Sequence, residues 1–282
     1  MLLFNTQNEL TAHLNSVSNE STAIGFVPTM GALHKGHLSL LEESLKNNQI
    51  NVISIFVNPT QFNNAEDLAK YPKTLVEDMA KIKTVSDDII VFAPSVDDIY
   101  EGNTVSKHFD FDGLENQMEG KFRLGHFNGV ATIVKRLFEI VKPTNAYFGE
   151  KDFQQVQIVK KLVEKLKIKV NVTSCPIYRE SNGLAMSSRN ERLTNKEREK
   201  AAIIYKTILE AKKRFVSKSA KEVTEFVQRE FIKQPDFELE YFQIAEEVTL
   251  LPCIRKSPHK KYRAFIAVFV NKIRLIDTIS LN

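Results

Sequence analysis

Two hydrophobic patterns alternate over about the first 175 residues. Short runs that are apolar at nearly every position, such as Val52–Val57, predict strands buried on both faces of a sheet. Segments with apolar residues three or four positions apart, such as Leu75–Val85, predict amphipathic helices. Strands that alternate with helices in this way predict an α/β protein with a doubly wound, Rossmann-like parallel sheet.

The pattern locates each element of this first part. Thr6 and Glu9 have the spacing of a capping box, which predicts that a helix begins there. The other predicted helices begin around His37 or span Leu75–Val85, Gly129–Val141 and Phe153–Leu166. The predicted strands are Ala23–Val27, Val52–Val57, Ile89–Phe92, Ala146–Phe148 and Lys169–Thr173.

The pattern changes after residue 178. Charged amphipathic helices are predicted near Asn195–Val216 and Lys221–Lys233, and strands at Leu239–Ile244, Arg263–Val270 and on toward Asp277. We therefore predict a first domain of residues 1–176 that contains the doubly wound sheet, and a smaller C-terminal α+β domain of residues 177–282.

Composition narrows the class of protein. The 282 residues are 43% hydrophobic and 26% charged, with ten Gly and nine Pro, which excludes disordered and collagen-like chains. The longest apolar runs are too short for a transmembrane helix, and Met1–Asn5 has no basic region of a signal peptide. Cys175 and Cys253 form no CxxC pair. We expect a cytoplasmic protein with no membrane partner.

Charge is unevenly distributed. Residues 1–178 carry 18 Lys and Arg against 21 Asp and Glu, whereas residues 179–282 carry 21 against 14. A basic half could bind nucleic acid or a polyphosphate. The even spread of Lys and Arg across residues 196–233 favours a solvated helix surface, so we expect no nucleic-acid partner.

The first candidate site follows the first predicted sheet strand. Residues 28–37 read PTMGALHKGH and lead into a helix, the place where doubly wound sheets bind ligands. Gly31 and Gly36 allow close approach of the backbone to an anion, and His34 and His37 could donate to phosphate oxygens. Two loop histidines with structural partners, or a metal pair, are the alternatives. No Walker or GxGxxG pattern is present, which argues against a P-loop NTPase and a dehydrogenase.

Three further segments could meet a polar or anionic ligand. Asn58 and Gln61 follow the second strand, where Asn58 could equally serve the turn before Pro59. Lys151 begins a helix after the strand Ala146–Phe148, which suits an anion-binding role as well as a solvent-exposed lysine. Residues 179–190 are rich in hydroxyl and guanidinium groups, typical of a phosphate clamp or of a polar linker.

Four segments, PTMGALHKGH, SIFVNPTQF, FGEKDFQQ and GLAMSSRN, resemble the signatures of the pantoate–β-alanine ligase (pantothenate synthetase) family in order and spacing. The similarity continues through EDLAKYP, GHFNGVATIV and RLID, and so extends over almost the whole chain. His34 and His37 match the HxGH sequence of a wider nucleotidyltransferase superfamily, and MSSRN is similar to its KMSKS-type loop.

The resemblance implies a reaction. A member of this family uses ATP and Mg²⁺ to condense D-pantoate with β-alanine, through a pantoyl-adenylate, and releases pyrophosphate and AMP. The product, pantothenate, belongs to the coenzyme A pathway. The resemblance also implies a homodimer, and it assigns no metal ligand.

The resemblance implies roles for individual residues as well. It makes His37 the proton donor, and His34, Lys151 and Arg189 further catalytic residues. Gln61 and Gln155 would hold pantoate, with Gln61 also bordering β-alanine and Asn58 in the same pocket. The implied ATP-binding residues are Met30, Gly31, Ala32, Leu33, His34, Lys35, Gly36, His37, Gly149, Glu150, Lys151, Asp152, Tyr178, Met186, Ser187, Ser188 and Arg189.

Some positions depart from the family pattern. Leu124 stands where the family has Pro, Lys73 where it has Arg, and Tyr178 where it usually has Val. The last strand has no Gly before Arg274, which puts the local turn in doubt.

Two other functions are considered. One is a superfamily transferase that moves a nucleotidyl group to a phosphorylated acceptor, and an amine requirement for AMP release would separate it from the ligase. The other is a non-catalytic nucleotide-sensing or RNA-binding module that uses the basic C-terminal half, which predicts strongly salt-dependent binding.

Overall fold

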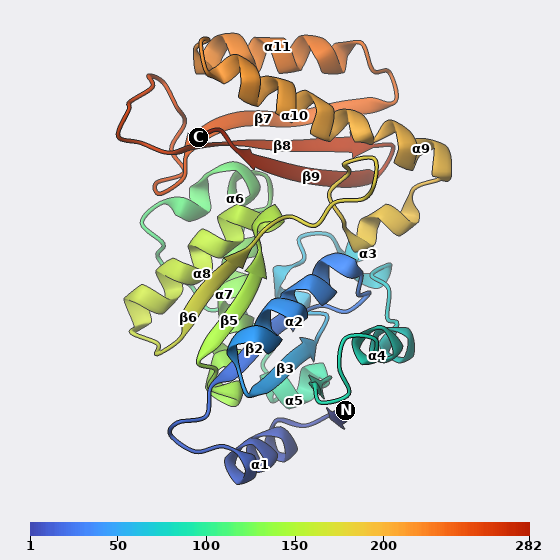
Figure 1. Cartoon of the computed structure of the whole chain (residues 1–282), viewed down its shortest axis with the longest axis vertical. Helices are drawn as coiled ribbons and strands as arrows, with labels where there is room; N and C mark the ends of the chain where they lie inside the picture. Colours follow the sequence, from blue (N-terminus) through green and yellow to red (C-terminus); the bar gives the residue numbers. More distant parts are fainter. The chain divides into compact units, whose positions relative to one another are not determined.

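The computed structural model describes residues 1–282 and divides into two compact units (Figure 1). Unit 1 consists of Met1–Glu115, Gly120–Gly149 and Gln155–Pro176. Unit 2 consists of Asn116–Glu119, Glu150–Gln154 and Ile177–Asn282. Two short segments from the first part of the sequence, residues 116–119 and 150–154, therefore fold with the C-terminal unit.

Unit 1 contains six parallel strands in the order β1-β4-β3-β2-β5-β6. The strands are β1 (Leu2–Phe4), β2 (Ile24–Thr29), β3 (Ile50–Ile55), β4 (Ile90–Phe92), β5 (Asn145–Gly149) and β6 (Asn171–Cys175). The order reverses between β2 and β5, where the chain turns to the other side of the sheet. This is the Rossmann-like, doubly wound sheet that the sequence predicts, and its switch point is at the ends of β2 and β5.

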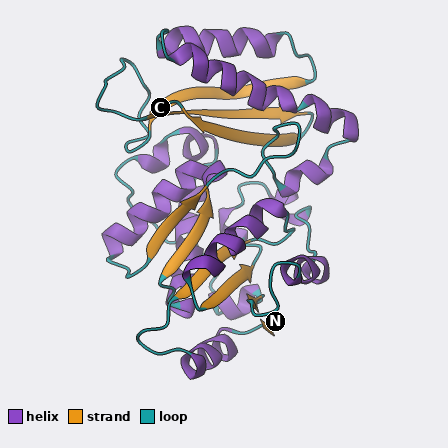
Figure 2. Ribbon diagram, in the orientation of Figure 1, coloured by secondary structure: helices purple, strands orange, loops and turns teal.

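Helices flank these strands (Figure 2). The helices before residue 176 are α1 (Gln7–Val17), α2 (Lys35–Asn47), α3 (Ala65–Ala69), α4 (Leu75–Lys83), α5 (Val96–Tyr100), α6 (Met118–Phe122), α7 (His126–Val141) and α8 (Phe153–Leu166), with 3-10 turns η1 (Pro59–Gln61), η2 (Leu114–Asn116) and η3 (Glu150–Asp152), of which η3 and the start of α6 belong to unit 2. Helix α2 packs Leu40 and Leu41 into a core with Val27 and Ile53 of the sheet. Burial of this apolar surface fixes the start of α2 beside the end of β2.

A close contact between α2 and β2 gives a stability prediction. A Cβ at Gly25 would lie 2.1 Å from Oγ of Ser44 and 2.6 Å from Nδ2 of Asn48, whose amide donates to the Tyr147 hydroxyl at 2.8 Å. Gly25→Ala forces these buried groups apart. We therefore expect the free energy of unfolding, measured by urea denaturation, to fall by about 2–3 kcal/mol. The exposed control Ser16→Ala is expected to change it by less than about 0.5 kcal/mol. An equally small effect of Gly25→Ala would contradict this packing.

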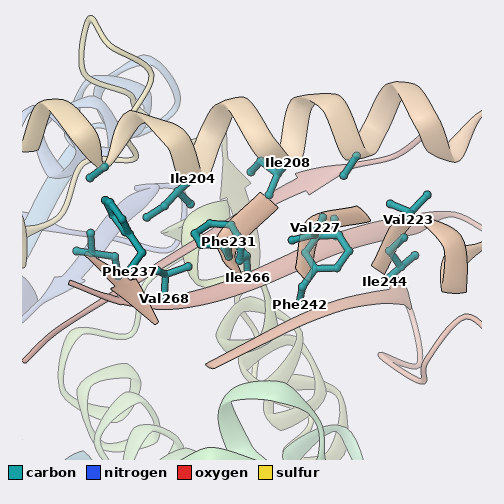
Figure 3. Packing of buried hydrophobic residues seen from close by; sticks show 14 of the residues in the cluster. Ile204, Ile208, Val223, Val227, Phe231, Phe237, Phe242, Ile244, Ile266 and Val268 are labelled. Carbon is teal, nitrogen blue, oxygen red and sulfur yellow. The ribbon is translucent and has the colours of Figure 1, made fainter. Parts of the chain in front are cut away.

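Unit 2 contains a three-stranded antiparallel sheet in the order β7-β8-β9. Its strands are β7 (Phe237–Glu246), β8 (Tyr262–Val270) and β9 (Ile273–Ser280), and its helices are α9 (Asn195–Lys200), α10 (Ala202–Phe215) and α11 (Ala220–Ile232), with the 3-10 turn η4 (Ser188–Arg192). Side chains of α10 and α11, such as Ile208 and Val227, pack against Phe242 and Ile266 of the sheet (Figure 3). The separate α+β fold of the C-terminal part is thus confirmed.

The structure confirms some predicted elements and corrects others. Helix α8 has its predicted bounds, and Thr6 Oγ1 accepts the Glu9 N–H at the start of α1. Helix α2 begins at Lys35, two residues before the expected start. The expected helix over 195–216 is two helices that meet at Ala201. None of the helices is long and apolar enough to span a membrane.

Candidate active site

Residues 30–37, which form the loop after β2 and the first turn of α2, are held in an unusual backbone conformation. Gly31 and Ala32 have φ values of 82° and 50°. The left-handed conformation is strained for alanine, and it persists here because Asp78 of α4 accepts the backbone N–H of Ala32 at 2.9 Å and of Leu33 at 2.7 Å. Lys81 donates to the Leu33 carbonyl at 2.6 Å. Helix α4 therefore fixes the path of the loop into α2.

Asp78 is fully buried, so its role in the loop gives a second stability prediction. Each carboxylate oxygen of Asp78 accepts one backbone N–H, from Ala32 or from Leu33. In Asp78→Asn one of these oxygens becomes an NH₂ group, which cannot accept and would face a backbone N–H. We expect unfolding free energy in urea to fall by about 2–3 kcal/mol. Asp87→Asn, on an exposed carboxylate after the same helix, is the control and is expected to have little effect. Equal stability of the two variants would contradict the role of Asp78.

The two histidines of the loop lie together at the start of α2. His34 is the N-cap residue and His37 lies in the first turn, with ring centroids 4.0 Å apart and an interplanar angle of 23°. The His34 backbone N–H donates to Nδ1 of His37 at 3.4 Å. In the neutral ring, this bond leaves the proton on Nε2 of His37. The site can thus offer an N–H donor beside the positive end of the α2 dipole.

Two predicted residues in the segment after β3 are linked by hydrogen bonds to the loop after β2. Asn58 is buried and donates from Nδ2 to Oε1 of Gln61 at 3.1 Å. Gln61, in η1, donates from Nε2 to the sulfur of Met30 at 3.1 Å. The predicted residues Asn58, Gln61 and Met30 therefore form one hydrogen-bonded group within unit 1.

In unit 2, the turn η3 carries Lys151. Its ammonium nitrogen lies 3.6 Å from Oδ2 of Asp152, and the Lys151 side chain is 18% exposed. Arg263 of β8 anchors the turn, because it donates to Glu150 at 3.2 Å and stacks over the ring of Phe153 with Cζ 4.0 Å from the centroid. A buried arginine of the small sheet thus fixes the backbone that carries Lys151.

A second anchor holds the hydroxyl-rich loop. Arg179 donates to both carboxylate oxygens of Asp277, at 2.7 and 3.0 Å, and stacks on the ring of Tyr205. Burial raises the pKa of the Asp277 carboxyl, and the hydrogen bonds and charge of Arg179 oppose this rise. The loop then folds back, with the Met186 N–H donating to the Tyr178 carbonyl at 3.0 Å. The segment is therefore a hydrogen-bonded hairpin within unit 2.

The last predicted residues follow this hairpin. Ser187 caps the 3-10 turn η4, and its Oγ accepts the Arg189 N–H at 3.3 Å. Tyr178, which differs from the family pattern, is 41% exposed. Gln155 lies in the first turn of α8 and is half-buried. Some predicted residues therefore contact one another, as His34 with His37 and Gln61 with Asn58 and Met30, and the set is divided between unit 1 and unit 2.

Sequence reasoning missed the residues that hold these segments. Asp78, Arg263 and the Arg179–Asp277 pair lie far in the sequence from most of what they fix, and the pattern gives no signal for such pairs. Asp277 does lie in the RLID motif, which is the one available hint. No group of three or more His, Cys, Asp or Glu side chains could hold a metal ion.

The comparisons with known proteins agree on one family. The model of the pantoate-beta-alanine ligase family matches residues 2–280. A pantothenate synthetase of Flavobacterium psychrophilum is 64% identical over 281 residues, with 100% of both chains covered.

Solved structures are similar over the whole chain too. The crystal structure of pantothenate synthetase from Thermus thermophilus gives a TM-score of 0.91 at 37% identity, covering 100% of this chain and 99% of that one. A pantoate-beta-alanine ligase from Francisella tularensis, complexed with beta-gamma ATP and beta-alanine, gives 0.80 at 34% identity, with 100% and 98% covered.

Proposed function

Since the chain belongs to the pantoate–β-alanine ligase family, we propose that the residues grouped above carry out that family's reaction. The chain is an ATP-dependent ligase that condenses pantoate with β-alanine to pantothenate, through a pantoyl-adenylate, and releases pyrophosphate and AMP. The observation that carries the proposed roles is the loop of residues 30–37, whose two stacked histidines lie at the N-terminus of α2.

The first half-reaction needs charge neutralisation more than a base. The pantoate carboxylate is ionised near pH 7, so its oxygen can attack the α-phosphorus directly, while the bond from that phosphorus to the β-phosphate oxygen breaks and pyrophosphate leaves. We propose that Lys151 and Arg189 neutralise phosphate charge, and that His34 and His37 donate hydrogen bonds to phosphate oxygens. The protonated Nε2 of His37 supports its role as the donor.

In the second half-reaction the neutral amine of β-alanine attacks the acyl carbon and AMP leaves. The mixed anhydride must be kept from water until the amine arrives. We propose that Gln61 and Gln155 hold pantoate, with Asn58 in the same pocket and Gln61 also bordering β-alanine. The Gln61–Met30 contact supports this, because it joins Gln61 to Met30, one of the proposed ATP-binding residues.

The proposed ATP-binding residues are residues 30–37, residues 149–152, Tyr178 and residues 186–189. We propose that Mg²⁺ enters as part of the ATP substrate, held by phosphates and water, since such sites need few protein ligands.

Further proposals concern the whole chain. We propose that residues 1–176 bind nucleotide and pantoate, that residues 177–282 act as a lid, and that the enzyme is a cytoplasmic homodimer. Sedimentation equilibrium tests the dimer, because a mass of one chain of 32.2 kDa at all concentrations would contradict it.

Pantoate-dependent exchange of labelled pyrophosphate into ATP tests the adenylate route. Adenylate formation is reversible before the amine enters, so exchange is expected with ATP, Mg²⁺ and pantoate and without β-alanine. Exchange that requires β-alanine would exclude a free-standing adenylate step. Transfer of a nucleotidyl group to a phosphorylated acceptor in its place would favour the other superfamily transferase.

A further inference from the structure

We infer that Tyr100, at the end of α5, is a positioning residue for Gln61: together with the Gly129 carbonyl it holds the Asn58 amide, which in turn orients the Gln61 amide toward the substrate. This inference rests on the proposed role of Gln61 in holding pantoate. The Tyr100 hydroxyl donates to Oδ1 of Asn58 at 2.6 Å, and Nδ2 of Asn58 donates to Oε1 of Gln61 at 3.1 Å. The three side chains thus form a hydrogen-bonded chain within unit 1, called the relay from here on.

The orientation of the Asn58 amide follows from a backbone group. Nδ2 of Asn58 lies 3.2 Å from the Gly129 carbonyl oxygen, which can only accept a hydrogen bond. The NH₂ end of Asn58 must therefore face Gly129, and its oxygen must face Tyr100. Asn58 is 1% exposed, so water cannot take over these contacts. The second N–H of Asn58 is then directed at Gln61.

The Gln61 amide takes its orientation from Asn58. Because Oε1 of Gln61 accepts from Asn58, the NH₂ end of Gln61 is the end that contacts Met30. A thioether is a weak acceptor, so a ligand oxygen can readily replace it. Gln61 is in this way fixed as a hydrogen-bond donor, which suits the carboxylate or hydroxyl oxygens of pantoate.

Two hydroxyl groups complete the relay at its far end. Thr60 Oγ1 donates to Oδ1 of Asn58 at 3.1 Å and lies 3.0 Å from the Tyr100 hydroxyl oxygen. Burial raises the pKa of the Tyr100 phenol, so the hydroxyl keeps its proton over the pH range of an enzyme assay. Oδ1 of Asn58 therefore receives donors from two side chains, of which Tyr100 is the nearer.

The backbone of Gln61 is fixed by helix α7. Nδ1 of His126 lies 2.8 Å from the Gln61 carbonyl oxygen. A Cβ at Gly129 would lie 2.2 Å from the Thr60 carbonyl oxygen and 2.7 Å from Cα of Gln61, so only glycine allows this approach. Helix α7 thus holds the Gln61 backbone, and the hydrogen bond from Asn58 restricts the rotation of the Gln61 amide.

Tyr100→Phe tests the inference, because it removes the hydroxyl and keeps the ring. We expect KM for pantoate to rise about fivefold to tenfold, with kcat and KM for ATP changed less than about twofold. Tyr147→Phe is the matched control: its hydroxyl is also buried and hydrogen-bonded, to Asn48, but lies away from Gln61. We expect it to leave KM for pantoate unchanged. Thr60→Val is a second variant that removes the other hydroxyl and should shift KM the same way.

A double-mutant cycle shows whether Tyr100 acts through Gln61. Gln61→Ala should raise KM for pantoate, and adding Tyr100→Phe should then change it no further. If Gln61→Ala leaves KM unchanged, the proposed role of Gln61 in binding pantoate fails and the inference falls with it. If Gln61→Ala raises KM but the Tyr100→Phe effect is absent, or persists in full in the Gln61→Ala enzyme, the inference alone is overturned.

Discussion

Replacing His37 with alanine is expected to lower the rate of pantoyl-adenylate formation at least ~10²-fold while the protein folds normally. The change removes the Nε2 N–H that the His34 backbone contact favours in the neutral ring, and with it a hydrogen-bond donor at the N-terminus of α2. Loss of one such donor to a transition state with developing charge costs about this much in rate. A single-turnover assay with enzyme in excess over ATP measures the step directly.

The outcome for His37 depends on a matched control. His108 is exposed, so His108→Ala should leave the rate unchanged. Circular dichroism and urea denaturation of His37→Ala should match the unchanged enzyme, because His37 is half-buried and its neighbours fix the loop through Asp78. A normal rate of adenylate formation in folded His37→Ala would contradict the donor role.

Lys151→Ala is expected to have an effect of similar size, at least ~10²-fold on adenylate formation. The lysine supplies a positive charge that neutralises phosphate oxygens as the bond to pyrophosphate breaks. Its side chain is mostly buried, and Arg263 fixes its turn through Glu150, so the charge is held in place before ATP binds. The same single-turnover assay measures the loss.

Lys160 provides the control for Lys151. It lies further along α8 and is exposed, so Lys160→Ala should bind ATP and form adenylate at the normal rate. Lys151→Arg keeps the charge and should recover part of the lost rate. Equal rates for Lys151→Ala and Lys160→Ala would remove Lys151 from the proposed machinery.

Local patterns predict the parts of this fold that local forces determine. The bounds of α8 follow from a continuous apolar spacing, and the start of α1 follows from Thr6 and Glu9. The order of strands is not in the pattern, although alternation of strands with helices implies a doubly wound sheet. Strand β1 (Leu2–Phe4) is missed, because it lies at the edge of the sheet with Leu2 and Leu3 exposed and so lacks the pattern of a buried strand.

The sequence leaves the turn before Arg274 in doubt, and in the structure this part of the chain forms a hairpin. The chain turns between Val270 and Ile273, where Asn271 adopts φ 53°, and β9 pairs antiparallel with β8. Glycine is the usual signal for such a turn, and this sequence has none there. Asparagine tolerates the left-handed conformation, so the turn forms without the expected residue.

In the candidate site, too, the sequence predicts what local patterns determine and misses contacts between distant residues. The loops that carry His34, His37 and Lys151 can be found from the sequence because they follow predicted strands. The residues that hold these loops, Asp78 and Arg263, belong to elements distant in sequence, and their contacts arise only when the chain is folded. Sequence therefore predicts which groups could react, and the structure explains how their positions are fixed.

The most direct test of the account is release of AMP and pyrophosphate by the purified protein with ATP, Mg²⁺ and D-pantoate, with and without β-alanine. We expect sustained release of AMP only when both pantoate and β-alanine are present, with one AMP formed for each pantothenate. Sustained AMP release without β-alanine, or no turnover by folded protein that still binds ATP, would contradict the assignment as a pantoate–β-alanine ligase.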